Sequence, residues 1–214
     1  ASNNTGVGST ALYANTSGNY SVAVGVQALR LNTTASANTA VGYRALYSNT
    51  TGTFNTSLGS YAGDNISTGS YNTSLGYNAN PLTPTTSNQF TLGDGNVGDL
   101  RCNDTSISSL SDSRDKTDVI NSPYGLDFIN TVRPVQFKWE TRDGNVKDGS
   151  TRLGFLAQEL LTAADGNNAV LNLVLEDNPD RLEAKYGNLL PIAIQAIQEL
   201  SAKNDALEAR LAAL

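Results

Sequence analysis

Ser111 and Lys116 stand five residues apart in the stretch SLSDSRDKTDVI, residues 109–120, among alternating acidic and basic side chains. A serine hydroxyl becomes a good nucleophile when a neighbouring base removes its proton, and a neutral lysine amine is able to act as that base. The same residues are compatible with a helix N-cap followed by a charged first turn, or with a solvated linker. The stretch therefore raises the question of whether it carries chemistry or only joins two parts of the chain.

The composition excludes most other covalent chemistry. The 214-residue chain contains no histidine, one cysteine (Cys102) and no methionine. Histidine-dependent triads, histidine metal sites and an intrachain disulfide are thereby ruled out, and no metal or cofactor is expected. Any covalent catalysis must use serine or threonine with lysine or a carboxylate.

The charge balance argues against several kinds of partner. The net charge of −6 disfavours nucleic acid and anionic membranes, because both need a basic footprint. No apolar run approaches the roughly 18–20 residues of a membrane span, and no signal-peptide pattern opens the chain. The first residue is alanine and methionine is absent throughout, which indicates a processed product or a C-terminal piece of a longer chain.

A 17-residue repeat fills the first half of the chain. Glycines recur every 17 residues, each preceded by a branched apolar residue, as in NTAVGYRAL at 38–46 and NTSLGSYAG at 55–63. The pairs are Val7-Gly8, Val24-Gly25, Val41-Gly42, Leu58-Gly59, Leu75-Gly76 and Leu92-Gly93. Threonine, valine and leucine favour a short, half-buried strand at each pair, and the glycine and asparagine clusters between the pairs favour turns.

Each repeat is too small to bury a core by itself, so the repeats must stack. Residues 1–93 contain only three charged side chains, Arg30, Arg44 and Asp64, a composition typical of disorder unless several copies pool their apolar faces. We therefore expect an oligomeric β-roll or β-prism with one layer per repeat; the alternative, a flexible stalk, is disfavoured by the strict period. The tyrosines of this half either pack between layers, which we favour, or present a binding face; they are Tyr13, Tyr20, Tyr43, Tyr47, Tyr61, Tyr71 and Tyr77.

The second half resembles an ordinary small α+β domain in its pattern. RPVQFKWE at 133–140 alternates apolar and polar residues like a half-buried strand, and RLGFLAQELLTAA at 152–164 indicates a strand or turn that passes into a helix. AVLNLVLEDN at 169–178 indicates another strand, and a short helix is expected after Pro123. The predicted organisation is a shaft at 1–93, a neck at 94–110, a compact unit at 111–188 and a C-terminal helix at 189–214.

From residue 190 onward the apolar residues follow the 3–4 spacing of a coiled coil. The seam consists of Leu190, Ala193, Ile197, Leu200, Asn204, Leu207, Leu211 and Leu214. Asn204 is a polar residue at an a position, which typically fixes register and partner number. Leu189 and Ile194 flank the seam and are expected to dock on the compact unit. A single amphipathic helix packed on its own domain is the alternative.

Two resemblances to known families follow from these motifs. The repeats at roughly 4–93 resemble those in the heads of trimeric bacterial adhesins and in bacteriophage tail-fibre shafts, where three chains form left-handed β-rolls or interlocked β-layers. Residues 111–214 resemble the C-terminal intramolecular chaperone domain of endosialidase-type phage tailspikes and tail fibres. Four collinear segments carry the second resemblance: SDSRDKTDV at 111–119, RPVQFKW at 133–139, GFLAQEL at 154–160 and YGNLLPIAIQAIQELSAKNDALEARL at 186–211.

The second resemblance implies a domain that trimerises, assists folding of the β-rich fibre before it, and then commonly cuts itself off. It implies a scissile bond between Leu110 and Ser111, with Ser111 as nucleophile and Lys116 as base. The enzymatic activity implied is at most that of a single-turnover self-cleaving endopeptidase. Asp112 and Arg114 match the motif as supporting, positioning residues.

The charges beside the lysine bear on this chemistry. Lysine has an unperturbed pKa near 10.4, so a lysine base must be desolvated or placed near other cations. Arg114 would favour the neutral amine of Lys116 if the two lie close, whereas Asp112 and Asp115 would favour its charged form. The family usually has an apolar residue where this chain has Asp115, and this carboxylate would slow the reaction.

The resemblances imply a function in a fibre. The leading hypothesis is the distal part of a homotrimeric viral tail fibre in the virion, whose partners are copies of itself and a host cell-surface glycan or receptor. The alternative is a trimeric bacterial surface adhesin that keeps the same fold uncleaved. A hydrolase acting on a separate substrate is disfavoured, because Asp64 is the only carboxylate before Asp94 and paired carboxylates are missing.

Overall fold

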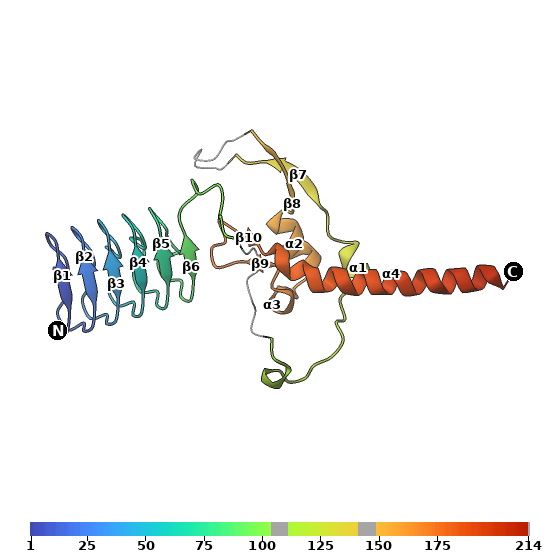
Figure 1. Cartoon of the computed structure of the whole chain (residues 1–214), viewed down its shortest axis with the longest axis horizontal. Helices are drawn as coiled ribbons and strands as arrows, with labels where there is room; N and C mark the ends of the chain where they lie inside the picture. The colour runs from blue at the N-terminus through green and yellow to red at the C-terminus, as the bar shows by residue number, and fades with distance from the viewer. Residues whose placement is uncertain (104–110, 141–148, 214) are drawn as a thin grey trace. The chain divides into compact units, whose positions relative to one another are not determined.

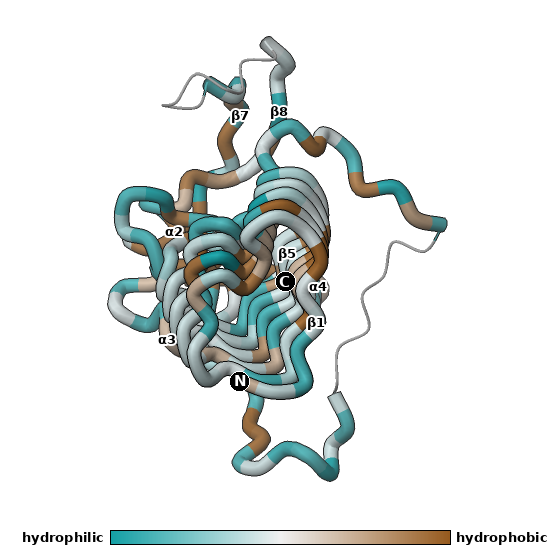
Figure 2. The backbone as a smooth tube through the Cα atoms, turned by 90° about the vertical axis from the view of Figure 1, so that its left-hand side faces the viewer, coloured by the Kyte–Doolittle hydropathy of each residue, from teal (hydrophilic) through white to brown (hydrophobic). Residues whose placement is uncertain are grey.

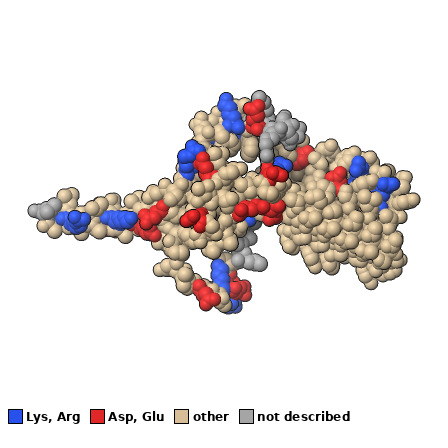
Figure 3. All heavy atoms as spheres, turned by 180° about the vertical axis from the view of Figure 1, so that it is seen from behind, with Lys and Arg blue, Asp and Glu red and all other residues tan. Residues whose placement is uncertain are grey.

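Two compact units make up the protein in the computed structural model, which describes residues 1–103, 111–140 and 149–213 (Figure 1). The first unit contains residues 1–100, and the second contains the described residues from 101 onward. Each unit has a hydrophobic cluster of its own. Charged side chains are few over the coils of the first unit and frequent over the second (Figure 3).

The first unit is a β-solenoid built from the 17-residue repeats. In the part of the chain that is described, six short strands pair in parallel, each with the next. They are β1 (Thr5–Val7), β2 (Val22–Val24), β3 (Thr39–Val41), β4 (Thr56–Leu58), β5 (Thr73–Leu75) and β6 (Phe90–Leu92). Partners are one period apart, as with Ala40 and Ser57, so successive coils superpose when viewed along this unit (Figure 2). The predicted repeat architecture is confirmed, and association of several copies stays a prediction.

Glycine recurs every 17 residues because the backbones of neighbouring coils lie very close together at this position. A Cβ atom on Gly42 would lie 2.3 Å from the carbonyl oxygen of Gly59, and Gly42 has a φ of +135°. The equivalent Cβ on Gly25 would lie 2.3 Å from the oxygen of Gly42. Since both the contact and the dihedral angle exclude larger residues, each coil needs glycine at this position.

The interior of the coils combines small apolar side chains with asparagine ladders. Leu29, Leu46 and Ile66 are fully buried beside the alanines at the strand centres. Asn49 Nδ2 donates to Asn32 Oδ1 at 3.0 Å, one coil away. Because the buried amides bond to one another and to backbone carbonyls, a sequence rich in asparagine and poor in charge still forms an ordered solenoid.

The branched residues before the glycines point outward from the solenoid. Val7 and Leu58 are 56% and 53% exposed, whereas Val24, Val41 and Leu75 are half-buried. The half-buried environment expected from the sequence is thus found for the second group, whereas Val7 and Leu58 pack less, because the central residue of each three-residue strand takes the inner position. The first and third residues of each strand lie on the outer side of the sheet, and we call the surface that they form the sheet face. It comprises Thr5, Val7, Val22, Val24, Thr39, Val41, Thr56, Leu58, Thr73, Leu75, Phe90 and Leu92. It carries no charge.

The second unit is a small α+β fold. Its elements are the 3-10 helix η1 (Ser113–Asp115), α1 (Leu126–Ile129), β7 (Val135–Lys138), β8 (Thr151–Gly154), α2 (Ala157–Ala164), α3 (Asn168–Leu171), β9 (Val174–Leu175), β10 (Glu183–Ala184), η2 (Tyr186–Asn188) and α4 (Leu189–Ala212). Strands β7 and β8 pair antiparallel, as do β9 and β10. The expected helix after Pro123, the strand at 133–140 and the strand-to-helix segment at 152–164 are confirmed.

The core of this unit is formed by α2, α3, β9 and the start of α4. Leu160, Leu173 and Val174 are buried together with Leu189 and Ile192. Leu189 therefore docks as expected.

Two expectations about this unit are wrong. Residues 169–178 contain the end of α3 and then β9, because Asn172 takes a left-handed conformation that ends the helix. Ile194 is exposed, and Ile192 takes the docking position, since Ile192 lies one helical turn from Leu189 and Ala196 on the same face of α4.

Candidate Ser–Lys site and the C-terminal helix

The structure brings Ser111 and Lys116 into contact. Lys116 Nζ donates a hydrogen bond to Ser111 Oγ over 2.6 Å. The turn η1 lies between the two residues, and its hydrogen bonds from Asp115 N to Asp112 O and from Lys116 N to Ser113 O fold the chain back on itself. This is the spacing that a hydroxyl nucleophile and an amine base require.

Asp112 and Arg114 form an ion pair beside this contact. Arg114 Nε lies 3.0 Å from Asp112 Oδ1, and Arg114 Nη2 lies 2.5 Å from Oδ2. Asp112 also accepts the backbone N–H of Arg114 at 2.9 Å, so Asp112 is the cap of η1, not Ser111. The guanidinium hydrogen bonds, and then the backbone one, hold the pKa of the Asp112 carboxyl below its ordinary value. The cap interpretation therefore applies to Asp112 and coexists with the Ser–Lys contact.

Every residue from 111 to 120 is exposed in the single chain. The charge of Arg114 is paired with Asp112 and is not directed at Lys116. A lysine acts as a base only in its neutral form, which burial or nearby cations favour. The structure thus places Ser111 and Lys116 in hydrogen-bond contact at an exposed position. Leu110, the other side of the expected scissile bond, lies outside the described residues.

Helix α4 has two different segments. Leu189, Ile192 and Ala196 are buried in the core of the second unit. From residue 201 to residue 213 every side chain is exposed, including Leu207 (57%) and Leu211 (72%). The earlier seam residues Leu190, Ile197, Leu200 and Asn204 are exposed as well. Ala193 is half-buried and Leu214 lies outside the described residues. The other seam residues form a largely apolar stripe that the described chain leaves exposed.

Glu199 joins α4 to α1. Glu199 Oε2 accepts the backbone N–H of Leu126 at 2.9 Å, and Oε1 accepts Gln195 Nε2 at 3.1 Å. The hydrogen bond from Leu126, followed by that from Gln195, lowers the pKa of the Glu199 carboxyl. A Cβ on Gly125 would lie 2.1 Å from Glu199 Oε1, so glycine makes room for this carboxylate.

Two further contacts hold the family motifs together. Arg133, just before β7, forms an ion pair with Glu159 on α2. The Tyr186 hydroxyl, just before α4, lies 3.2 Å from both the backbone nitrogen and the carbonyl oxygen of Phe155. Sequence reasoning missed Glu199 and Tyr186, because their partners are distant in sequence and no local pattern indicates them.

The protein is thus a β-solenoid followed by a small α+β unit and a long C-terminal helix. Residues 111–171 match the family model described as chaperone of endosialidase. The match begins at Ser111 and includes the three motifs at 111–119, 133–139 and 154–160, which confirms the resemblance for this segment. No curated protein and no solved structure matches the chain.

The described residues offer no alternative site of two common kinds. Among residues 1–103, 111–140 and 149–213, no three cysteine or carboxylate side chains lie together in a way that would hold a metal ion. Within the same ranges, no helix has both the length and the apolar character of a membrane span.

Proposed function

We propose that this chain is the distal part of a homotrimeric viral tail fibre, and that residues 111–214 act as the intramolecular chaperone that trimerises and folds the solenoid. The single observation that carries the proposal is the match of residues 111–171 to the chaperone of endosialidase, directly between a β-solenoid and a helix with an uncovered apolar seam. That the assembly contains three copies of the chain rests on the family resemblance.

The exposed part of α4 supports self-association. Twelve residues of isolated helix, from Ser201 to Ala212, are marginal in water unless their apolar side is packed. The apolar side consists of the seam leucines at heptad spacing. Asn204, at an a position, would fix the register in which the helices of the copies pair. A second copy of the same helix is therefore the partner that fits this stripe.

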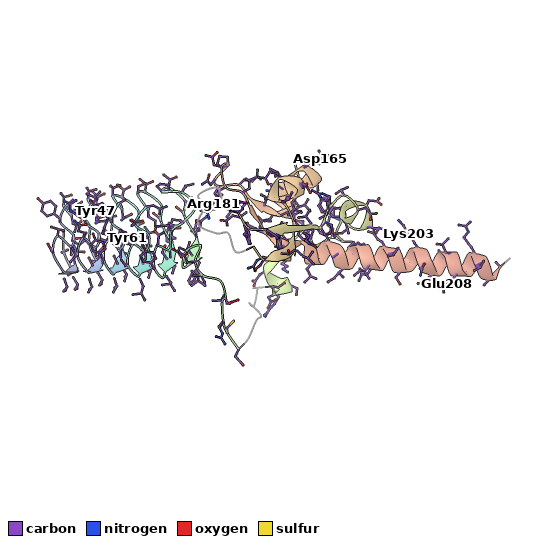
Figure 4. The ribbon with its side chains drawn as sticks, turned by 90° about the horizontal axis from the view of Figure 1, so that it is seen from above. Tyr47, Tyr61, Asp165, Arg181, Lys203 and Glu208 are labelled. Carbon is purple, nitrogen blue, oxygen red and sulfur yellow. The ribbon has the colours of Figure 1, made fainter. Side chains whose placement is uncertain are left out.

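The charges beside the seam favour parallel helices. With Leu200 and Leu207 at d positions, Lys203 falls at g and Glu208 at e, five residues later. In a parallel coiled coil a g residue meets the e residue of the next heptad on the neighbouring chain, so Lys203 would pair with Glu208 of another copy. An antiparallel arrangement would instead bring the basic residues Lys203 and Arg210 together. Figure 4 labels Lys203 and Glu208 on the helix.

The sheet face supports association of the shaft. It is apolar or hydroxylic throughout and bears exposed Val7, Leu58, Phe90 and Leu92. Contiguous apolar surface of this kind is typical of an interface between chains. Parallel α4 helices would hold the solenoids of three copies at a high local concentration, which favours contact between their sheet faces.

Self-cleavage at Ser111 is the second part of the proposal. Lys116 removes the proton from Ser111 Oγ, which attacks the carbonyl carbon of Leu110. The bond from that carbon to the Ser111 nitrogen breaks, the nitrogen takes a proton from Lys116, and an ester links Leu110 to Oγ. Water then hydrolyses the ester to a Leu110 carboxylate and the free hydroxyl. Since the dyad is exposed in one chain, neighbouring copies would provide the covering, so cleavage follows assembly.

The alternative function is a bacterial surface adhesin that ends in the same fold. The observation that favours it is Asp115, which stands next to Lys116 where the family usually has an apolar residue. Light scattering of the full chain tests the shared part of both functions: we expect a trimer, and a monomer at micromolar concentration would contradict it.

A further inference from the structure

A row of tyrosines and arginines crosses the coils on the part of each repeat that follows the glycine turn. Tyr13, Arg30 and Tyr47 are one period apart and stack in successive coils. The guanidinium carbon of Arg30 lies 5.7 Å from the ring centres of both tyrosines. Arg30 Nη1 also donates to the Tyr47 hydroxyl at 2.8 Å. The guanidinium group of Arg30 therefore contacts the tyrosines of both neighbouring coils.

The row continues through a second arginine. The guanidinium carbon of Arg44 lies 4.2 Å from the ring centre of Tyr47 and 5.3 Å from that of Tyr61. Tyr61 contacts Tyr43 and Tyr77 edge to face, at centre distances of 5.2 and 6.2 Å. Tyr47 and Tyr61 are labelled in Figure 4. We call this set the tyrosine–arginine row; it comprises Tyr13, Arg30, Tyr43, Arg44, Tyr47, Tyr61 and Tyr77.

The row concentrates positive charge. Arg30 and Arg44 flank the same ring, that of Tyr47, and they are the only basic residues among residues 1–93. Two like charges near each other repel, and a bound anion would relieve the repulsion. Asp64, the one carboxylate of this stretch, already accepts a hydrogen bond from Asn80 Nδ2 at 3.1 Å.

Two of the seven side chains of the row lie at a coil position whose backbone is left-handed in successive repeats, including at Thr10 and Gln27. Arg44 and Tyr61 occupy equivalent positions with φ near +57° and +58°. Asparagine is among the residues best suited to that conformation, and Asn78 takes the same position one coil later with φ of 52°. Packing also leaves much of the row uncovered, since Tyr13 is 71% and Tyr77 is 62% exposed. The row therefore presents exposed aromatic rings beside two arginine side chains, a combination that a ligand can reach.

We propose that the tyrosine–arginine row binds an acidic glycan, a linear polymer whose pyranose rings carry carboxylates. Exposed tyrosine rings stack on the apolar faces of sugars and offer hydroxyl groups for hydrogen bonds, while planar guanidinium groups pair with carboxylates. Two arginines suit a ligand with widely spaced anionic groups. Nucleic acid fits less well, because its charges are more densely spaced and it is typically bound through more than two basic residues. An acidic peptide also fits less well, because its residues do not each offer a flat apolar face to an aromatic ring.

This inference rests on the proposed fibre function, for which it names the glycan class and its site. The row lies within one chain, however, and its binding does not depend on the chaperone role. The test uses the full chain and measures mass by light scattering alongside binding. Loss of the trimer then contradicts the chaperone proposal, and loss of binding contradicts the present one.

Calorimetric titration of the full chain with oligogalacturonate is the experiment. We expect binding that is absent with neutral oligogalactan and much weaker with polyglutamate and single-stranded DNA. Arg30→Gln and Arg44→Gln should each weaken it about tenfold, and Tyr77→Ala should weaken it too. Arg101→Gln makes the same charge change outside the row, and Tyr20→Ala removes an exposed tyrosine elsewhere; both should bind like the unmodified protein.

Several results would overturn the proposal. They are failure of oligogalacturonate to bind, equal binding of the neutral oligomer, polyglutamate or DNA, and unchanged affinity in both arginine variants. Tyr13→Ala, which removes an exposed ring and its contact with Arg30 while keeping both arginines, serves as a further variant if an arginine variant folds poorly. Circular dichroism of each variant establishes that the solenoid is intact.

Discussion

Lys116 Nζ and Ser111 Oγ are joined by a 2.6 Å hydrogen bond across the single turn η1. The contact is local, so the chain forms it without help from distant residues. Both side chains are nevertheless exposed, and an exposed lysine is a poor base. In our proposal this contact links chemistry to assembly: each chain brings the two side chains together, and neighbouring copies would cover them.

Self-cleavage predicts defined fragments. The denatured protein should contain pieces divided between Leu110 and Ser111, and Ser111→Ala should abolish them by removing the nucleophile. Lys116→Arg should abolish them as well, because a guanidinium keeps its proton. Intact mass spectrometry is the measurement, with Lys138→Arg as the matched control. A wild-type sample with one undivided mass would exclude cleavage and favour the adhesin alternative.

The seam predicts that one buried charge prevents assembly. Leu207→Asp should convert the oligomer to a monomer at micromolar concentration, because a carboxylate at a d position would be buried between helices. Ala209→Asp adds the same charge two residues away, on the opposite side of α4, and should leave the mass unchanged. Light scattering distinguishes them, and equal masses for the two variants would contradict the seam.

The solenoid predicts that its glycines are irreplaceable. Gly42→Ala should destabilise the first unit by at least about 2 kcal/mol, since the new Cβ meets the oxygen of Gly59 and φ is +135°. Gly98→Ala is the matched control, because a Cβ there has open space and φ lies outside the strained range. Urea unfolding followed by circular dichroism measures both, and similar midpoints would show that the coils do not approach so closely.

The Glu199 contact predicts acid sensitivity of the second unit. The pKa of Glu199 is lowered from 4.5, chiefly by the hydrogen bond from Leu126 N. A depressed carboxyl pKa stabilises the fold above the unfolded value, and this contribution is lost as pH falls through the folded pKa. Glu199→Gln should lower the Tm at pH 7 by a few degrees and flatten the acid dependence. Asp205→Asn, an exposed carboxylate on the same helix, should do neither; equal Tm profiles for the two variants would argue against the contact.

The sequence was most informative where a feature repeats or is local. The glycine period predicted the solenoid because each glycine faces the backbone of the next coil, and the heptad spacing predicted the exposed stripe of α4. The Ser111–Lys116 contact could also be proposed from the resemblance, since it spans one turn.

The sequence was least informative where tertiary contacts decide. Three-residue strands gave no alternation long enough to show that Val7 and Leu58 point outward. The apolar run at 169–178 indicated a strand throughout, whereas Asn172 in a left-handed conformation separates the end of α3 from β9. Glu199 reaches Leu126 from 73 residues away, and no local signal marks such a partner.

The central claim is that residues 111–214 are needed to fold the solenoid, and refolding with and without them tests it most directly. Residues 1–110 alone and the full chain are refolded from denaturant, and the yield and mass of soluble product are measured. We predict soluble trimer from the full chain and aggregate from residues 1–110. A soluble, ordered product from residues 1–110 alone would contradict the claim.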